Sequence, residues 1–192
     1  MADFYFGLDS NPPQAKFDFV FVAMHEITHG LGFGSIVGGD GKYRLYDSLF
    51  NPHETTLPSI FDRFVEARYG PDKMKPITFM DKLERAAAVI SDDLFWGSQF
   101  GIAGNTGQPV ELYAPSTFVS GSSVSHLDLA AFPNELMRPK YAPSNFPNHS
   151  IGLIELGMLK DIGWIAVPDP STLLLLGSGL VGAGLIRFGR NK

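Results

Sequence analysis

The chain has 192 residues, enough for one domain with a hydrophobic core, and its apolar share of 44% and charged share of 18% are those of a folded globular protein. Its formal net charge of -5, with no cluster of basic residues before the C-terminal end, argues against a general nucleic-acid-binding protein. The absence of cysteine excludes disulfides, thiolate metal sites and a cysteine nucleophile.

The first predicted elements are a short strand and a buried helix. Apolar residues alternate with others at positions 4–8, which is typical of a strand, and prolines at positions 12 and 13 end it. A helix is expected from Asp18, a residue type that caps helix N-termini, to the glycines at positions 30, 32 and 34. Because the segment FVFVAMHEITHGL is apolar around almost its whole circumference, we expect this helix to be buried.

The rest of the domain is expected to be rich in loops. Segments 59–70 and 77–97 have helical patterns, and the helix in the second segment is expected to end near the turn at residues 91–93. Segment 107–116 has strand character, and segment 150–164 predicts a final helix. One side of this last helix would be formed by Ile151, Ile154, Met158, Leu159 and Ile162. A proline-rich boundary near residue 166 divides the chain into a compact domain, residues 1–166, and a tail, residues 167–192.

A histidine pair with a glutamate between its members lies on the first predicted helix, in the sequence HEITHGLGFGS at residues 25–35. Residues four apart share one face of a helix, so His25 and His29 can hold one Zn²⁺ at about 2.0–2.1 Å. Glu26 lies next to that face and is expected to act as a general base toward water activated by the metal. Placing these polar groups in so apolar a segment would be costly without a partner, which favours a metal site over two ordinary buried histidines.

Catalytic zinc usually has three protein ligands and one open position, so a third ligand is needed. Many zinc proteases carry a histidine where this chain has Ser35, and serine is a poor zinc ligand beside histidine or carboxylate. The chain has no Glu-x-x-x-Asp or Gly-Thr-x-x-Asp pattern that would supply a carboxylate. The remaining histidines are His53, His126 and His149, of which His53 and His149 are expected to be ordinary surface residues.

The segment SHLDLAAFPNELMRP, residues 125–139, resembles the third-ligand and methionine-turn segment of leishmanolysin-like metzincin proteases. In that family the third histidine lies far beyond the HExxHxxGF helix, and a Glu-Leu-Met element follows it. The resemblance implies an α+β, zincin-like catalytic domain with a buried zinc helix, an irregular C-terminal half and a final helix. It also implies one zinc ion bound by His25, His29 and His126, with Glu26 as the base and Met137 in the turn beneath the metal.

Three further residues are candidates for supporting roles in such a site. Asp128 and Glu135 would orient His126 as hydrogen-bond partners, and the Tyr141 hydroxyl would donate a hydrogen bond to the oxyanion. Metzincins also have an N-terminal subdomain with a twisted sheet, whereas only about 17 residues precede the zinc helix here. The sheet subdomain is therefore expected to be truncated, and no signal peptide is expected in this chain.

The tail VPDPSTLLLLGSGLVGAGLIRFGRNK, residues 167–192, resembles a PEP-CTERM sorting signal of exported proteins from Gram-negative bacteria. Such a signal has a short motif, here Val167, Pro168, Asp169 and Pro170, followed by an apolar stretch and a basic end. The resemblance implies processing by an exosortase-type enzyme near the motif. It also implies a short transmembrane segment that anchors the protein transiently and places the domain at the cell surface or outside the cell.

The function predicted from these patterns is that of a zinc-dependent endopeptidase acting on protein or peptide substrates, without a nucleic-acid partner. One alternative is a catalytically inactive, exported surface or matrix protein that keeps a structural metal site. The other is a zinc hydrolase whose substrate is not a peptide.

Overall fold

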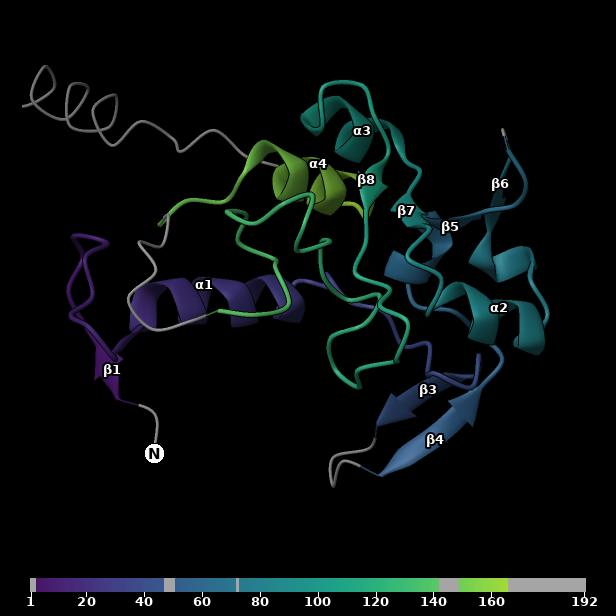
Figure 1. Cartoon of the computed structure of the whole chain (residues 1–192), viewed down its shortest axis with the longest axis horizontal. Coiled ribbons are helices and arrows are strands. Elements are labelled where there is room, and N and C mark those ends of the chain that lie inside the picture. The colour runs from purple at the N-terminus through teal and green to yellow at the C-terminus, as the bar shows by residue number, and fades with distance from the viewer. Residues whose placement is uncertain (1–2, 47–50, 72, 142–148, 166–192) are drawn as a thin grey trace, which may run out of the picture.

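The computed structural model describes residues 3–46, 51–71, 73–141 and 149–165 (Figure 1). The described part is a mixed α+β fold with four α-helices and small sheets, in agreement with the predicted class. The tail, with the predicted motif Val167, Pro168, Asp169 and Pro170, lies outside the described residues. None of the helices in the described part has the length and apolarity needed to cross a membrane.

Helix α1 spans Phe19–Gly30 and begins at the predicted residue, because the Asp18 carboxylate accepts a hydrogen bond from the Phe21 amide. Strands β1 (Phe4–Tyr5) and β2 (Phe17–Asp18) pair in parallel just before it. The prediction of a buried helix is wrong. Phe21 and Thr28 are buried, but Ile27 is 62% exposed, and Phe19, which the rings of Phe4 and Phe6 contact, is 43% exposed.

The largest sheet has four antiparallel strands in the order β6-β5-β7-β8. Its strands are Met74–Pro76 (β6), Val65–Arg68 (β5), Leu94–Trp96 (β7) and Val110–Glu111 (β8), and a separate hairpin pairs β3 (Tyr43–Tyr46) with β4 (Pro52–Thr55). The helix predicted at residues 59–70 is instead the 3₁₀-helix Phe61–Phe64 followed by β5. Of the helix predicted from residue 77 to the turn near residues 91–93, the 3₁₀-helix Ile77–Phe79 and α2 (Lys82–Ala88) are helical. Strand character was expected at 107–116, and β8 lies there.

Helices α3 (Gln99–Gly104) and α4 (Leu153–Asp161) pack closely against each other. The helices approach so closely at Gly157 that a Cβ atom there would lie 2.2 Å from the Phe100 carbonyl oxygen. The Asp161 carboxylate joins the pair by accepting hydrogen bonds from the Gly101 amide at 2.8 Å and the Trp96 indole at 2.9 Å. The predicted final helix is confirmed, and its predicted apolar side packs on the core.

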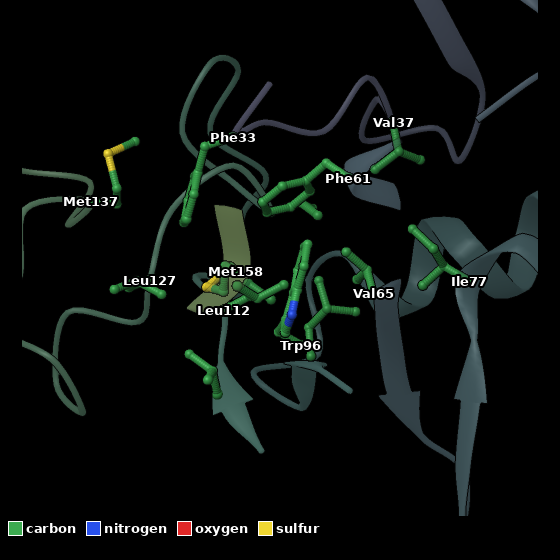
Figure 2. Close-up of a cluster of buried hydrophobic side chains, with 14 of the residues drawn as sticks. Phe33, Val37, Phe61, Val65, Ile77, Trp96, Leu112, Leu127, Met137 and Met158 are labelled. Carbon is green, nitrogen blue, oxygen red and sulfur yellow. The ribbon is translucent and has the colours of Figure 1, made fainter. Parts of the chain in front are cut away.

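The core lies between the C-terminal end of α1, the large sheet and α4 (Figure 2). Its centre is aromatic, with ring centroids 5.1 Å apart for Phe33 and Phe61 and 4.8 Å apart for Phe61 and Trp96. Leu127 and Met137, at one end of this cluster, come from the irregular segment that follows β8. The core thus fixes the backbone of that segment, which has no helix or strand between Leu112 and Tyr141.

Candidate metal centre

Three histidines from two distant parts of the chain meet at one point. His25 and His29 lie one turn apart on α1, and His126 lies in the irregular segment after β8. The Nε2 atoms are 3.2 Å apart for His25 and His29, 3.3 Å for His29 and His126, and 3.2 Å for His25 and His126. Nitrogens about 2.0–2.1 Å from a tetrahedral zinc ion are about 3.3–3.4 Å apart. The three predicted ligands therefore lie close enough to hold one metal ion.

The second nitrogen of each ring fixes its tautomer. Each Nδ1 lies at hydrogen-bond distance from a backbone carbonyl oxygen: Leu136 for His25 at 2.8 Å, Phe33 for His29 at 2.6 Å and Ser122 for His126 at 2.9 Å. A carbonyl oxygen only accepts, so each Nδ1 carries the proton and each Nε2 of a neutral ring presents a lone pair. Three lone pairs that converge without a donor are the arrangement that a metal cation satisfies.

Burial favours the neutral form of two of these rings, His25 and His126. His126 is only 4% exposed, and desolvation is the main cause that lowers its pKa to about 4. The pKa of His25 is also lowered, mainly by burial, and the positive charge of Arg138 contributes to the shift. The neutral imidazole is the form that binds metal, so His25 and His126 are ready to ligate at neutral pH.

Backbone hydrogen bonds hold the His126 segment in place. The His126 carbonyl accepts from the Tyr113 amide at 2.9 Å, and the Leu127 amide donates to the Met137 carbonyl at 2.8 Å. Met137 is fully buried, and its amide donates to Glu155 Oε1 at 3.1 Å. The predicted methionine turn is therefore tied by its backbone to the residue that follows the third ligand. That Met137 lies beneath the metal stays a prediction.

Neither acidic residue predicted to orient His126 does so. The Asp128 carboxylate accepts hydrogen bonds from the Ala130 amide at 2.8 Å and the Ala131 amide at 3.0 Å, so it stabilises the turn that follows. Glu135 lies against Gly152, and its charge acts on Glu155. The orienting group is the Ser122 carbonyl, four residues before the histidine.

Ser35 takes part in a hydrogen-bond network that the sequence did not predict. Its hydroxyl donates to Asp62 Oδ1 at 2.5 Å, and its amide donates to Ser125 Oγ at 3.1 Å. Asp62 is fully buried and also accepts from the Ser59 amide and hydroxyl, and burial raises its pKa. Ser35 therefore joins the loop after α1 to the residue before His126. The network brings together residues 35, 59, 62 and 125, so no local pattern reveals it.

The other two histidines lie apart from the triad. His53 is exposed on β4, as predicted. The prediction that His149 is an ordinary surface residue is wrong, because its Nε2 lies 2.9 Å from Oδ1 of the fully buried Asp18. His149 thus contacts the residue that caps α1, the helix of His25 and His29.

A small open pocket of about 170 Å³ adjoins the triad. Glu26 is exposed and lines this pocket together with His25, Phe21, Val22, Arg138, Pro139 and Tyr141. The Tyr141 hydroxyl accepts a long hydrogen bond, 3.4 Å, from the Asp18 amide. Asp18 precedes His25 by seven residues, or about 10 Å of helix. The hydroxyl thus lies near the start of α1 and also borders this pocket, and the role of Tyr141 as an oxyanion donor stays a prediction.

The centre offers three imidazoles next to one carboxylate. Among the described residues, the group that could hold a metal contains His25, His29 and His126 and no fourth ligand. Glu26 comes from the same helix turn as His25 and faces an open pocket. No protein-family model, no curated protein and no solved structure matches this chain.

Proposed function

We propose that this protein is a zinc-dependent endopeptidase that hydrolyses bonds within protein or peptide substrates. The observation that carries the proposal is the convergence of three Nε2 lone pairs beside Glu26, at a pocket open to solvent. A structural zinc site is usually closed by four protein ligands, whereas a catalytic site has three and keeps one position open. Three ligands in the described part of the chain, with an exposed glutamate beside them, favour the catalytic type.

Each side chain of the centre has a defined task in this proposal. A zinc ion held by His25, His29 and His126 would supply Lewis-acid chemistry, polarising a carbonyl group and lowering the pKa of water to about 7. The Glu26 carboxylate takes a proton from the attacking water and passes it to the leaving nitrogen. The carbonyls of Leu136, Phe33 and Ser122 keep the Nδ1 protons in place, so the rings need no reorientation when metal binds.

A peptide substrate is favoured over other substrates by the resemblance of the helix and of residues 125–139 to leishmanolysin-like metzincins. The zincin-like architecture belongs to the same proposal. Export of the protein, proposed from the tail, belongs to it as well. An exosortase-type enzyme would be the partner, residues 171–186 would anchor the protein transiently in the membrane, and the protein would be released at the cell surface. Mass spectrometry of the mature C-terminus would test this part, because an intact tail on the exported protein contradicts processing.

The enzymatic proposal is tested with zinc-loaded protein, its zinc content measured, on casein and on a fluorogenic peptide library. Wild-type protein should cleave, lose cleavage with a chelator and regain it with zinc. Glu26→Gln should keep one zinc per chain but lose activity by about 10²–10⁴-fold, the usual value of general-base catalysis. The matched control is Glu111→Gln, an exposed carboxylate on β8, which should cleave like wild type. Zinc-loaded wild type that cleaves nothing, or zinc-loaded Glu26→Gln at the wild-type rate, would refute the proposal.

A further inference from the structure

Arg138 is a buried cation in the wall of the pocket that adjoins the metal centre. It is only 7% exposed, and its guanidinium carbon lies 5.1 Å from the Phe21 ring centroid and 5.4 Å from that of Tyr141. Its Nη1 donates to the Pro133 carbonyl. Its Nε is buried without a hydrogen-bond partner, and no carboxylate of the described residues forms an ion pair with it.

A buried guanidinium stays charged, and leaving its donors unpaired is unfavourable unless another interaction compensates. The two aromatic rings and one carbonyl supply part of that compensation. Burial lowers the pKa of Arg138, in agreement with an incompletely stabilised charge. If Arg138 served only to hold its loop on α1, a neutral side chain of similar size would do so without an unpaired donor.

The position of this charge connects it to the reaction. Arg138 lines the same pocket as His25, a metal ligand, and Glu26, the proposed base. Its charge is close enough to contribute to the lowered pKa of His25, after the larger effect of burial. With Nη1 occupied by Pro133, the edge formed by Nε and Nη2 is the part of the guanidinium without a hydrogen bond to a described residue. That edge matches a carboxylate, which binds two parallel N–H groups.

We propose that Arg138 binds a carboxylate of the substrate next to the scissile bond. This inference rests on the proposed peptidase function and adds its substrate class: peptides with an acidic side chain, or a free C-terminal carboxylate, at the residue that enters this pocket. A space of about 170 Å³ takes one side chain rather than a long segment, so the preference should be confined to a single subsite.

The test compares kcat/KM for peptides that differ only by Glu or Gln at each position around the scissile bond. Wild-type protein should prefer Glu at one position by about 10–100-fold, the range expected for a charge-assisted bidentate pair. In Arg138→Met this ratio should fall to about one, while the zinc content stays near that of wild type. Arg138→Lys keeps the positive charge and the aliphatic part of the side chain but loses the two parallel N–H donors. Its Glu/Gln ratio should therefore lie between those of wild type and Arg138→Met. The control is Arg63→Met, because Arg63 is exposed and lies outside the pocket.

Two further peptides distinguish the sources of the carboxylate. Preference for an internal Glu in a peptide with an amidated C-terminus identifies an acidic side chain as the ligand. Preference for a free C-terminus in a peptide without acidic residues identifies the terminal carboxylate. Two results would overturn the proposal. One is equal rates on the Glu and Gln peptides together with equal rates on peptides with free and amidated C-termini. The other is a preference that Arg138→Met leaves unchanged.

A binding measurement separates this inference from the proposed function. In zinc-loaded Glu26→Gln, N-acetyl-glutamate α-amide should shift NMR signals of the pocket, and N-acetyl-glutamine α-amide should bind at least about 10-fold more weakly. N-acetylglycine serves as the probe for a terminal carboxylate. If no peptide is cleaved but these carboxylates bind through Arg138, the peptidase function fails and the carboxylate site stands. If none of them binds and peptides are cleaved without preference, only the Arg138 proposal fails.

Discussion

His126 Nε2 lies 3.2 Å from His25 Nε2, although 101 residues separate the two histidines along the chain. Two backbone contacts explain how this distance is maintained. The Leu136 carbonyl accepts from the His25 ring, and the Met137 carbonyl accepts from the Leu127 amide. One short stretch, residues 136–137, therefore contacts both the helix and the segment that carries the third ligand.

We predict that His126→Ala weakens zinc binding by more than about 100-fold. Loss of a residue that merely orients a ligand costs about 10–100-fold in affinity, and loss of the ligand itself should exceed this. Competition with a chromophoric chelator measures the affinity. His53→Ala, which removes an exposed histidine outside the triad, is the control and should bind like wild type. Equal affinities for wild type and His126→Ala would show that another group completes the centre.

Asp62→Ala should destabilise the fold by about 2–4 kcal/mol, because it leaves the hydroxyls of Ser35 and Ser59 without their acceptor. Ser35→Ala removes one of these bonds and should cost about 1 kcal/mol without removing a metal ligand. Urea denaturation measures both changes. Ser120→Ala, at an exposed serine, should leave the free energy of unfolding within about 0.5 kcal/mol of wild type. Wild-type stability in Asp62→Ala would contradict the network.

Glu155 should make stability fall as the pH rises. It is 0% exposed, and burial, assisted by the charge of Glu135, raises its pKa to about 7. A carboxyl group with a raised folded-state pKa contributes its full stability below its unfolded-state pKa. That stability is lost as pH rises through about 7, by an amount on the order of 1–3 kcal/mol.

The variant Glu155→Gln isolates this contribution, because it keeps an acceptor for the Met137 amide and cannot ionise. His126, with its pKa lowered to about 4, has the opposite effect, since its protonation destabilises the fold as pH falls from about 6.5 toward 4. This effect cancels when wild type and variant are compared. Thermal unfolding between pH 4 and 8 should show the variant gaining on wild type as pH rises, and parallel profiles would refute the assignment.

Two glycine substitutions should have opposite effects on stability. Gly157→Ala places a methyl group 2.2 Å from the Phe100 carbonyl oxygen, so α3 and α4 must separate, at a cost of about 1–3 kcal/mol. Gly30→Ala is the control, because nothing lies within 4 Å of a Cβ atom there and alanine favours helix by up to about 1 kcal/mol. Thermal unfolding should separate the two, and an unchanged Gly157→Ala midpoint would show that the helix pair tolerates the methyl group.

The parts of the structure that the sequence predicted well depend on neighbouring residues. Asp18 caps α1 by bonding an amide three residues away, and the spacing of His25 and His29 is set by the helix itself. The final helix is likewise predicted from the spacing of the apolar residues within its own segment. His126 was placed by the resemblance of its flanking residues to a known pattern, since spacing alone could not relate residues about a hundred positions apart.

The parts that were missed depend on partners distant in sequence. Phe61, Phe64 and Val65 fit a helical period as well as a strand, and pairing with β7 decides the outcome for Val65. The exposure of Ile27 on α1 was missed for a similar reason, because no described element covers this side chain. Hydrophobicity alone does not tell whether a partner is present.

Backbone acceptors around the metal centre also affect how much sequence change it can tolerate. Any residue at position 122 presents a carbonyl to His126, so Ser122 can change without loss of the acceptor as long as the backbone keeps its path. Phe33 and Leu136 are constrained by the core in which they are buried, not by the histidines that their carbonyls contact. Related chains can therefore diverge at the positions that orient the ligands while the ligands themselves stay fixed. A search for an acidic residue paired with each histidine would pass over centres of this kind.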